Sequence, residues 1–247
     1  MTAQDTPVRV EERDDRLVVA LDRPAKRNAL DSAMVDALHD VCATLERSPK
    51  LLLLTGGAGG VFAGGADIAQ LRERGRLEAL AAINMGLMER VRRLPMPTLA
   101  AVDGPALGGG AELAYACDLR ICTSRAYFGQ PEVRLGIIAG AGACFRLPAL
   151  VGEGLAKEML YTGRPVLAAE ALAVRLVNRA VEDPAELLPA AHAMLDDIAK
   201  GSPLAVRLTK AVVDAAPAAH PQLDLASQAI LFEDEEKRAR MTAFLER

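Results

Sequence analysis

The sequence predicts an α/β fold built on a parallel β-sheet. Short apolar runs such as Leu51–Leu54 and Thr98–Val102 alternate with stretches of helical periodicity, an order typical of parallel strands joined by helical crossovers. Apolar and polar residues do not alternate in these runs, which indicates strands that are buried on both faces. Two glycine-rich segments, Gly56–Gly65 and Gly108–Gly110, follow such runs. Because open α/β sheets bind ligands where strands end, we expect both segments to border a site.

The first quarter of the chain predicts a hairpin followed by a helix. Val8–Val10 and Leu17–Leu21 flank an acidic turn, which indicates two antiparallel strands. Arg23–Leu30 is a polar loop, and Asp31 is placed to cap a helix that runs to Arg47.

The rest of the chain changes from strand–helix alternation to helices. A helix is expected over Leu77–Leu94, ended by prolines, and a strand at Leu119–Thr123. One further apolar stretch is Leu176–Val181. The later helices are expected at Glu153–Leu160, Ala168–Val174, Pro184–Lys200, Pro203–Ala215 and Gln222–Leu245.

Composition narrows the class of protein. Of the 247 residues 51% are hydrophobic and 25% charged, enough for a sizeable core in one large domain. Only 3% are aromatic and none is Trp, so no platform for stacking bases is visible. A net charge of −4 also argues against a nucleic-acid partner.

Cysteines, histidines and hydropathy exclude other classes. There is no Cys-x-x-Cys pair, so we expect buried thiols in a reducing compartment. The histidines lie away from both glycine segments, which disfavours zinc or Ser-His chemistry. No apolar run of about 18 residues and no secretory leader is visible, so we expect a soluble, cytoplasmic protein without membrane contact. The residues concerned are Cys42, Cys117, Cys122, Cys144, His39, His192 and His220.

The first candidate for chemistry is Glu112, two residues after Gly108–Gly110 and in the first turn of an expected helix. Glycines leave the backbone N–H groups open to a ligand, and the first turn of a helix has unpaired N–H groups. Such a site stabilises an oxygen that acquires negative charge, and a carboxylate beside it can transfer protons. The alternative is a tight turn whose glutamate only favours the helix start.

The second candidate is Glu132, which precedes another pair of glycines, Gly140 and Gly142. If the two glutamates share one pocket, their pKa values separate and give one acid and one base. The alternative is a surface ion pair with Arg134 or Arg146.

Nucleotide and hydrolase signatures are absent. The chain contains no G-x-G-x-x-G, no G-x-x-x-x-G-K-[ST] and no G-x-S-x-G. Lys26 and Arg27 can meet ligand phosphates or lie in an ordinary exposed loop.

Five segments, in order and over nearly the whole chain, resemble the enoyl-CoA hydratase/isomerase (crotonase) superfamily. They are LDRPAKRNAL at 21–30, FAGGADIAQL at 62–71, GPALGGGAELAYACDLR at 104–120, FGQPEVRLGIIAGAG at 128–142 and AKEMLYTGR at 156–164.

The resemblance implies a crotonase-like ββα-spiral core over residues 1–190, which holds the acyl-CoA site, and a C-terminal helical trimerisation region over 191–247. It implies a homotrimer or a dimer of trimers. It also implies neither metal nor cofactor, since coenzyme A arrives as part of the substrate.

The resemblance assigns the oxyanion hole to the N–H groups of Ala66 and Gly109. It implies an enoyl-CoA hydratase of fatty-acid β-oxidation type, in which Glu112 activates water and Glu132 protonates the α-carbon. By the same resemblance, Phe244 and Arg247 reach a neighbouring subunit's CoA. The expected contacts to substrate or CoA are Lys26, Arg27, Ala29, Gly64, Ala66, Asp67, Ile68, Gly108, Gly140, Phe244 and Arg247.

Two alternatives remain at this point. One is an enoyl-CoA double-bond isomerase or a hydratase of a specialised acyl-CoA, since Ala139 and the triplet Ala143–Phe145 depart from the family pattern beside the acyl pocket. The other is a non-catalytic protein that binds acyl-CoA or a partner on the same fold.

Overall fold

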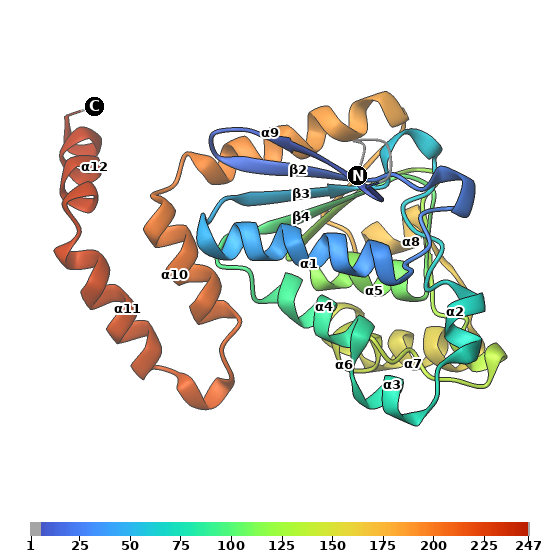
Figure 1. The fold of residues 1–247 in the computed structure, drawn as a ribbon. Coiled ribbons are helices and arrows are strands. Elements are labelled where there is room, and N and C mark those ends of the chain that lie inside the picture. Colours follow the sequence, from blue (N-terminus) through green and yellow to red (C-terminus); the bar gives the residue numbers. More distant parts are fainter. Residues whose placement is uncertain (1–5, 247) are drawn as a thin grey trace.

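The computed structural model describes residues 6–246 and contains a six-stranded sheet of order β1-β2-β3-β4-β6-β9 (Figure 1). β1 and β2 form the antiparallel hairpin that the sequence predicts, and every other neighbouring pair is parallel. The strands are β1 Val8–Glu12, β2 Arg16–Leu21, β3 Leu51–Thr55, β4 Thr98–Val102, β6 Leu119–Thr123 and β9 Arg179–Val181.

Helices cover both faces of this sheet, with α1 (Ser32–Arg47) on one side and α9 (Leu187–Ala199) on the other (Figure 1). Successive residues of a strand point to opposite faces. Leu52 and Leu54 of β3 therefore join the core on the α1 side, and Leu53 packs with α9. Asp31 caps α1 as predicted, because its carboxylate accepts the Met34 N–H at 2.9 Å.

A second, three-stranded sheet was not predicted. Its order is β5-β7-β8, with β5 (Pro105–Leu107) parallel to β7 (Tyr127–Gly129) and β8 (Val166–Leu167) antiparallel to β7. β5 lies between β4 and Gly108, so it is this short strand that leads into the second glycine segment.

α5 (Gly109–Ala116) is the central helix, and all of its residues are buried. Its carboxyl end is held by the buried Arg120, whose guanidinium donates to the carbonyl oxygens of Ala114 at 3.1 Å and Cys117 at 2.6 Å. Burial lowers the pKa of Arg120 to about 10. These bonds satisfy carbonyls that no helix can pair internally and fix the direction of α5.

Two predicted helices are each divided in the structure. The segment expected as Leu77–Leu94 consists of α3 (Arg76–Leu80) and α4 (Ile83–Arg92), because Ala82 has a φ of 54° and breaks the helical path. The segment expected as Gln222–Leu245 is interrupted at Asp234, which is extended and accepts the Glu236 N–H at 3.1 Å to cap a new helix.

Of the other predicted helices, α7 Glu153–Thr162, α8 Ala168–Ala173 and α10 Pro203–Val213 agree with the expected ranges within a few residues, and the divided last segment consists of α11 Gln222–Glu233 and α12 Glu235–Leu245. The sequence predicts no bounds for α2 Ile68–Glu73, for α6 Ala143–Val151, or for the 3₁₀ turns η1 Pro24–Lys26, η2 Gly57–Gly59, η3 Glu132–Leu135, η4 Pro184–Glu186 and η5 Pro217–Ala219.

The C-terminal helices α11 and α12 extend away from the layered core (Figure 1). α10 stays tied to the core, because its buried Lys210 contacts the Asp118 carboxylate at 2.6 Å. The approximate boundary predicted between residues 190 and 191 falls inside α9, which packs on the sheet through Leu187, Ala191 and Leu195. No helix among residues 6–246 has the length and apolar character that a membrane crossing requires.

The prediction that all four cysteines are buried is wrong at one position. Cys42, Cys117 and Cys122 are buried, but Cys144 is exposed. It lies near the start of α6, whose inner side is taken by Ala143 and Leu147.

Candidate active site

A cavity of about 650 Å³ lies between the α2–α4 segment, the start of α5 and the η3 turn. Its walls are mostly apolar, and they include both candidate glutamates and both glycine-rich loops. The sequence-predicted residues that line it are Gly64, Ala66, Ile68, Gly108, Gly109, Glu112, Glu132 and Gly140.

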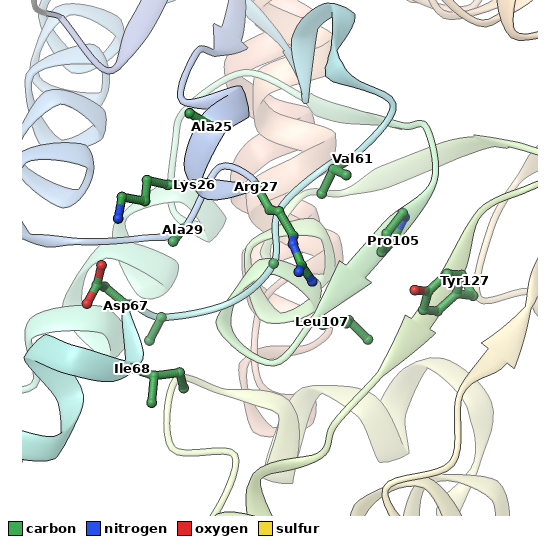
Figure 2. A pocket seen from close by; sticks show the side chains of 12 residues that line it. Ala25, Lys26, Arg27, Ala29, Val61, Asp67, Ile68, Pro105, Leu107 and Tyr127 are labelled. Atoms are coloured by element: carbon green, nitrogen blue, oxygen red, sulfur yellow. The ribbon is translucent and has the colours of Figure 1, made fainter.

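A second pocket, of about 350 Å³, adjoins the first and shares Gly64, Ala66 and Ile68 with it; its lining residues are drawn in Figure 2. It carries the basic side chains of Lys26 and Arg27. Figure 2 shows the side chains of Lys26, Arg27 and Ala29 from the η1 region, Asp67 and Ile68 from the start of α2, and Leu107 and Tyr127 from the second sheet.

The first glycine loop is held so that the Ala66 N–H stays unpaired. Leu30 and Ala66 form a parallel bridge in which the Leu30 N–H donates to the Gly65 carbonyl at 2.8 Å and the Asp67 N–H donates to the Leu30 carbonyl at 3.3 Å. In an extended chain the intervening N–H points the other way. Within residues 6–246 the Ala66 N–H has no acceptor.

The second glycine loop offers another unpaired N–H at the start of α5. Gly108, with a φ of 50°, donates to the Gly129 carbonyl at 2.9 Å, and the first helical bond runs from the Glu112 N–H to the Gly108 carbonyl. Gly109 therefore has a first-turn N–H without a partner in the described chain. A β-carbon on Gly109 would lie 3.5 Å from the Ala66 nitrogen, so the two N–H groups belong to one site.

Glu112 is almost completely buried and is held by backbone donors. Its Oε1 accepts the Ala141 N–H at 2.8 Å and the Ala143 N–H at 3.0 Å. Burial raises the pKa of Glu112 because it disfavours the charged form, and the two N–H donors act in the opposite direction by stabilising the carboxylate. The two donors also fix where the side chain points.

Glu132 is half-buried on η3, across the cavity from α5. Burial raises its pKa to about 7, and the negative charge of Glu112 adds to the effect. The buried Gln130 amide lies against this carboxyl group: with its nitrogen toward Glu132 it donates to both carboxylate oxygens at 3.0 Å. With its oxygen there it accepts the O–H of the protonated acid, so Gln130 suits either protonation state.

The ion-pair alternative for these glutamates is wrong among residues 6–246. The Arg134 guanidinium donates to the Thr162 carbonyl at 2.8 Å, and Arg146 donates to the Tyr115 carbonyl at 3.1 Å. Neither arginine lies within 4.0 Å of a glutamate oxygen. The carboxyl groups of Glu112 and Glu132 therefore pair with neither arginine, and both residues line the cavity.

Comparison with known proteins identifies the family. The model of the family described as enoyl-CoA hydratase/isomerase matches residues 12–247. The chain belongs to this family. It is 37% identical to a short-chain-enoyl-CoA hydratase of Clostridium acetobutylicum, over 93% of this chain and 91% of that protein. It is 38% identical to a crotonyl-CoA hydratase of Syntrophomonas wolfei, over 96% and 94%.

Solved structures agree with the fold predicted for this family. An enoyl-CoA hydratase from Bacillus anthracis superposes with a TM-score of 0.91 at 31% sequence identity, covering 97% of this chain and 96% of that one. The predicted crotonase-like fold class is therefore confirmed.

Of the two residues that the family resemblance assigned to a neighbouring subunit's CoA, Phe244 does not line either pocket of its own chain. Phe244 lies on α12, 74% exposed, in the part of the molecule that extends away from the core (Figure 1). Arg247 lies outside the described residues. Their assignment to a neighbouring subunit's site stays a prediction.

Sequence reasoning missed three polar residues that shape the site of this family member. The buried Asn28 donates to the carbonyls of Gly56 at 2.8 Å and Val61 at 3.0 Å and so ties η1 to the first glycine loop. Arg74 and Asn84 line the larger cavity. Asn28 has a left-handed φ of 53°, which is typical of asparagine in a turn. The Arg-Asn-Ala sequence before a predicted helix could therefore have indicated that Asn28 shapes a turn beside the site.

Proposed function

We propose that this chain is an enoyl-CoA hydratase, which adds water across the α,β double bond of an enoyl-CoA thioester and gives a β-hydroxyacyl-CoA. The observation that carries the proposal is that Glu112 and Glu132 line the same cavity as the unpaired N–H groups of Ala66 and Gly109. A double-bond isomerisation needs one proton shuttle, whereas hydration uses two proton transfers around one water. The hydratases among the relatives support the same reading.

The thioester oxygen of the substrate accepts hydrogen bonds from the Ala66 and Gly109 N–H groups. Attack on the β-carbon moves electrons toward this oxygen, and the two donors stabilise the enolate that forms. The start of α5 adds the positive end of a helix dipole. Donors of this kind typically contribute about 10²–10³ in rate each.

Glu112 acts as the base and Glu132 as the acid. The two N–H donors on Glu112 favour its ionised form, so it takes one proton from water while the remaining hydroxide bonds to the β-carbon. Glu132, with a pKa raised to about 7, retains a proton near neutral pH and delivers it to the α-carbon. Proton exchange with solvent then restores both groups.

The rest of the substrate is bound without further cofactor or metal. Lys26 and Arg27 contact phosphates of CoA along the smaller pocket, and Asp67 and Ile68 border its entrance. The chain works as a homotrimer or a dimer of trimers joined by its C-terminal helices, in which Phe244 and Arg247 reach the neighbouring subunit's CoA. It acts in the cytoplasm, in fatty-acid β-oxidation.

The test is hydration of crotonyl-CoA, followed as loss of the conjugated enoyl-thioester absorbance. Glu112→Gln and Glu132→Gln each reduce kcat by about 10²–10⁴, since each removes one proton transfer. Glu153→Gln is the matched control, because Glu153 is 72% exposed and, within residues 6–246, pairs with Lys157 at the surface. Crotonyl-CoA that binds to the wild type without loss of absorbance contradicts the proposal and favours an isomerase or a non-catalytic protein.

A further inference from the structure

Three polar side chains interrupt the apolar wall that the α2–α4 segment gives to the larger cavity: Arg74, Asn84 and the exposed Glu78. Arg74 directly follows α2, and Asn84 is the second residue of α4. Both line the cavity and both are half-buried. The Arg74 guanidinium donates to the Asn84 Oδ1 at 2.9 Å, so the two form a connected pair.

This contact determines the orientation of the Asn84 amide. A guanidinium only donates, so the amide oxygen faces Arg74 and the NH₂ group faces away from it. The Asn84 Nδ2 lies 3.8 Å from the position that a β-carbon on Gly109 would occupy, beside the proposed thioester site. Within residues 6–246 it donates to no acceptor. Donor groups of Gly109, Asn84 and Arg74 therefore line the same cavity.

The charge of Arg74 is not balanced by an ion pair in the described chain. Its neighbour Arg72 contacts Glu73 at 2.7 Å, but no carboxylate oxygen lies within 4.0 Å of the Arg74 nitrogens. Glu78 carries a carboxylate on the same wall of the cavity, but this carboxylate accepts a hydrogen bond from the Gly75 N–H at 2.8 Å and none from Arg74. When a substrate displaces water from the cavity, an unpaired guanidinium loses solvation and gains most from an anionic partner.

We propose that Arg74 and Asn84 select enoyl-CoA substrates whose short acyl chain ends in a carboxylate. The Arg74 guanidinium binds one oxygen of the distal carboxylate, and the Asn84 NH₂ donates to the other oxygen of the same carboxylate. The chain is short because one asparagine side chain spans the gap between Gly109 and Arg74. This inference rests on the proposed hydratase activity and specifies its substrate class.

The test compares two substrates of equal carbon number, pent-2-enoyl-CoA and its terminally carboxylated analogue pent-2-enedioyl-CoA. We expect the wild type to hydrate the carboxylated substrate with a kcat/KM about 10–100-fold higher, the typical gain from a charged hydrogen-bonded pair. Arg74→Met lowers kcat/KM for pent-2-enedioyl-CoA about 10–100-fold more than for pent-2-enoyl-CoA, and so brings the ratio of the two near one. Arg72→Met, on the same segment but paired with Glu73 at the surface, leaves both unchanged.

A purely structural role for the Arg74–Asn84 contact predicts a different pattern. Arg74→Met would then lower kcat/KM for both substrates together. The inhibition constants of the saturated analogues pentanoyl-CoA and pentanedioyl-CoA, measured as competitive inhibitors, report the same preference in binding alone, because neither analogue is hydrated. A wild-type ratio near one, or a ratio unchanged in Arg74→Met, overturns the inference while the hydratase stands. Failure of the wild type to hydrate either substrate, or crotonyl-CoA, counts against the hydratase itself.

Discussion

Glu112 and Glu132 line one cavity, yet the elements that carry them differ. Glu112 lies on α5, a helix with every residue buried, and two backbone N–H groups hold its Oε1. Glu132 lies on η3, a turn with no buried residue, and its side-chain neighbour is the Gln130 amide. Burial raises the pKa of both carboxyl groups. The Ala141 and Ala143 N–H groups oppose that rise in pKa at Glu112, whereas at Glu132 its own N–H opposes the rise and the charge of Glu112 adds to it.

The position of Glu132 depends on the absence of a side chain at Gly108. A β-carbon there would lie 2.7 Å from the Glu132 Oε1, closer than van der Waals contact allows. Gly108→Ala therefore displaces Glu132 and lowers kcat for crotonyl-CoA hydration by about 10–100-fold, since a small misplacement of a catalytic group is costly. Glu112, held by its own donors, keeps its place.

Gly152→Ala is the control for this variant. Gly152 has a φ of 81°, also a conformation that favours glycine, but a β-carbon there meets nothing within 4 Å. It therefore carries backbone strain without the contact to Glu132. Equal losses of activity in the two variants would show that strain, and not the position of Glu132, is responsible.

The raised pKa of Glu132 also predicts a pH-dependent cost in stability. The folded state holds this proton up to about pH 7, while an ordinary glutamate releases it near 4.5. The native state thus binds more protons, so this group destabilises the fold progressively as pH rises from about 4.5 to 7. Glu132→Gln should raise the free energy of unfolding by about 1–2 kcal/mol at pH 8, allowing for partial solvent contact, and leave it unchanged at pH 4.

Denaturant unfolding of the wild type and Glu132→Gln at the two pH values measures this difference. Glu153→Gln, at an exposed surface site, is the control for replacing a glutamate by a glutamine. If the difference in the free energy of unfolding between Glu132→Gln and the wild type is the same at pH 4 and pH 8, burial does not raise the pKa of Glu132 and this prediction is wrong.

The sequence predicts the chemistry of α5 better than that of the α2–α4 segment, for a physical reason. Three consecutive glycines followed by Glu112 specify both a close backbone approach and a helix start, and these are local properties. The cavity-facing position of Asn84 depends instead on the helix break at Ala82, which has a left-handed φ although alanine favours a helix. Only tertiary packing imposes that conformation, so no pattern in the sequence indicates it.

The same distinction applies to the loops and strands. The hairpin and the apolar runs of the main sheet follow from periodicity, and their strands appear where expected. The three-residue strand β5 has too little pattern to be predicted, because it is stabilised by pairing with β7 and by a bridge from Ala63 to Ala106. The exposure of Cys144 likewise follows from how α6 docks and not from the residue type.

The most direct test of different roles for the two glutamates is a ¹³C NMR titration of protein labelled at the glutamate side-chain carboxyl carbons. Glu112→Gln and Glu132→Gln assign the two resonances by their disappearance. The Glu132 carboxyl group is predicted to titrate with a midpoint near 7. A Glu132 midpoint in the ordinary range near 4.5 would leave Glu132 ionised at neutral pH and contradict its assignment as the acid.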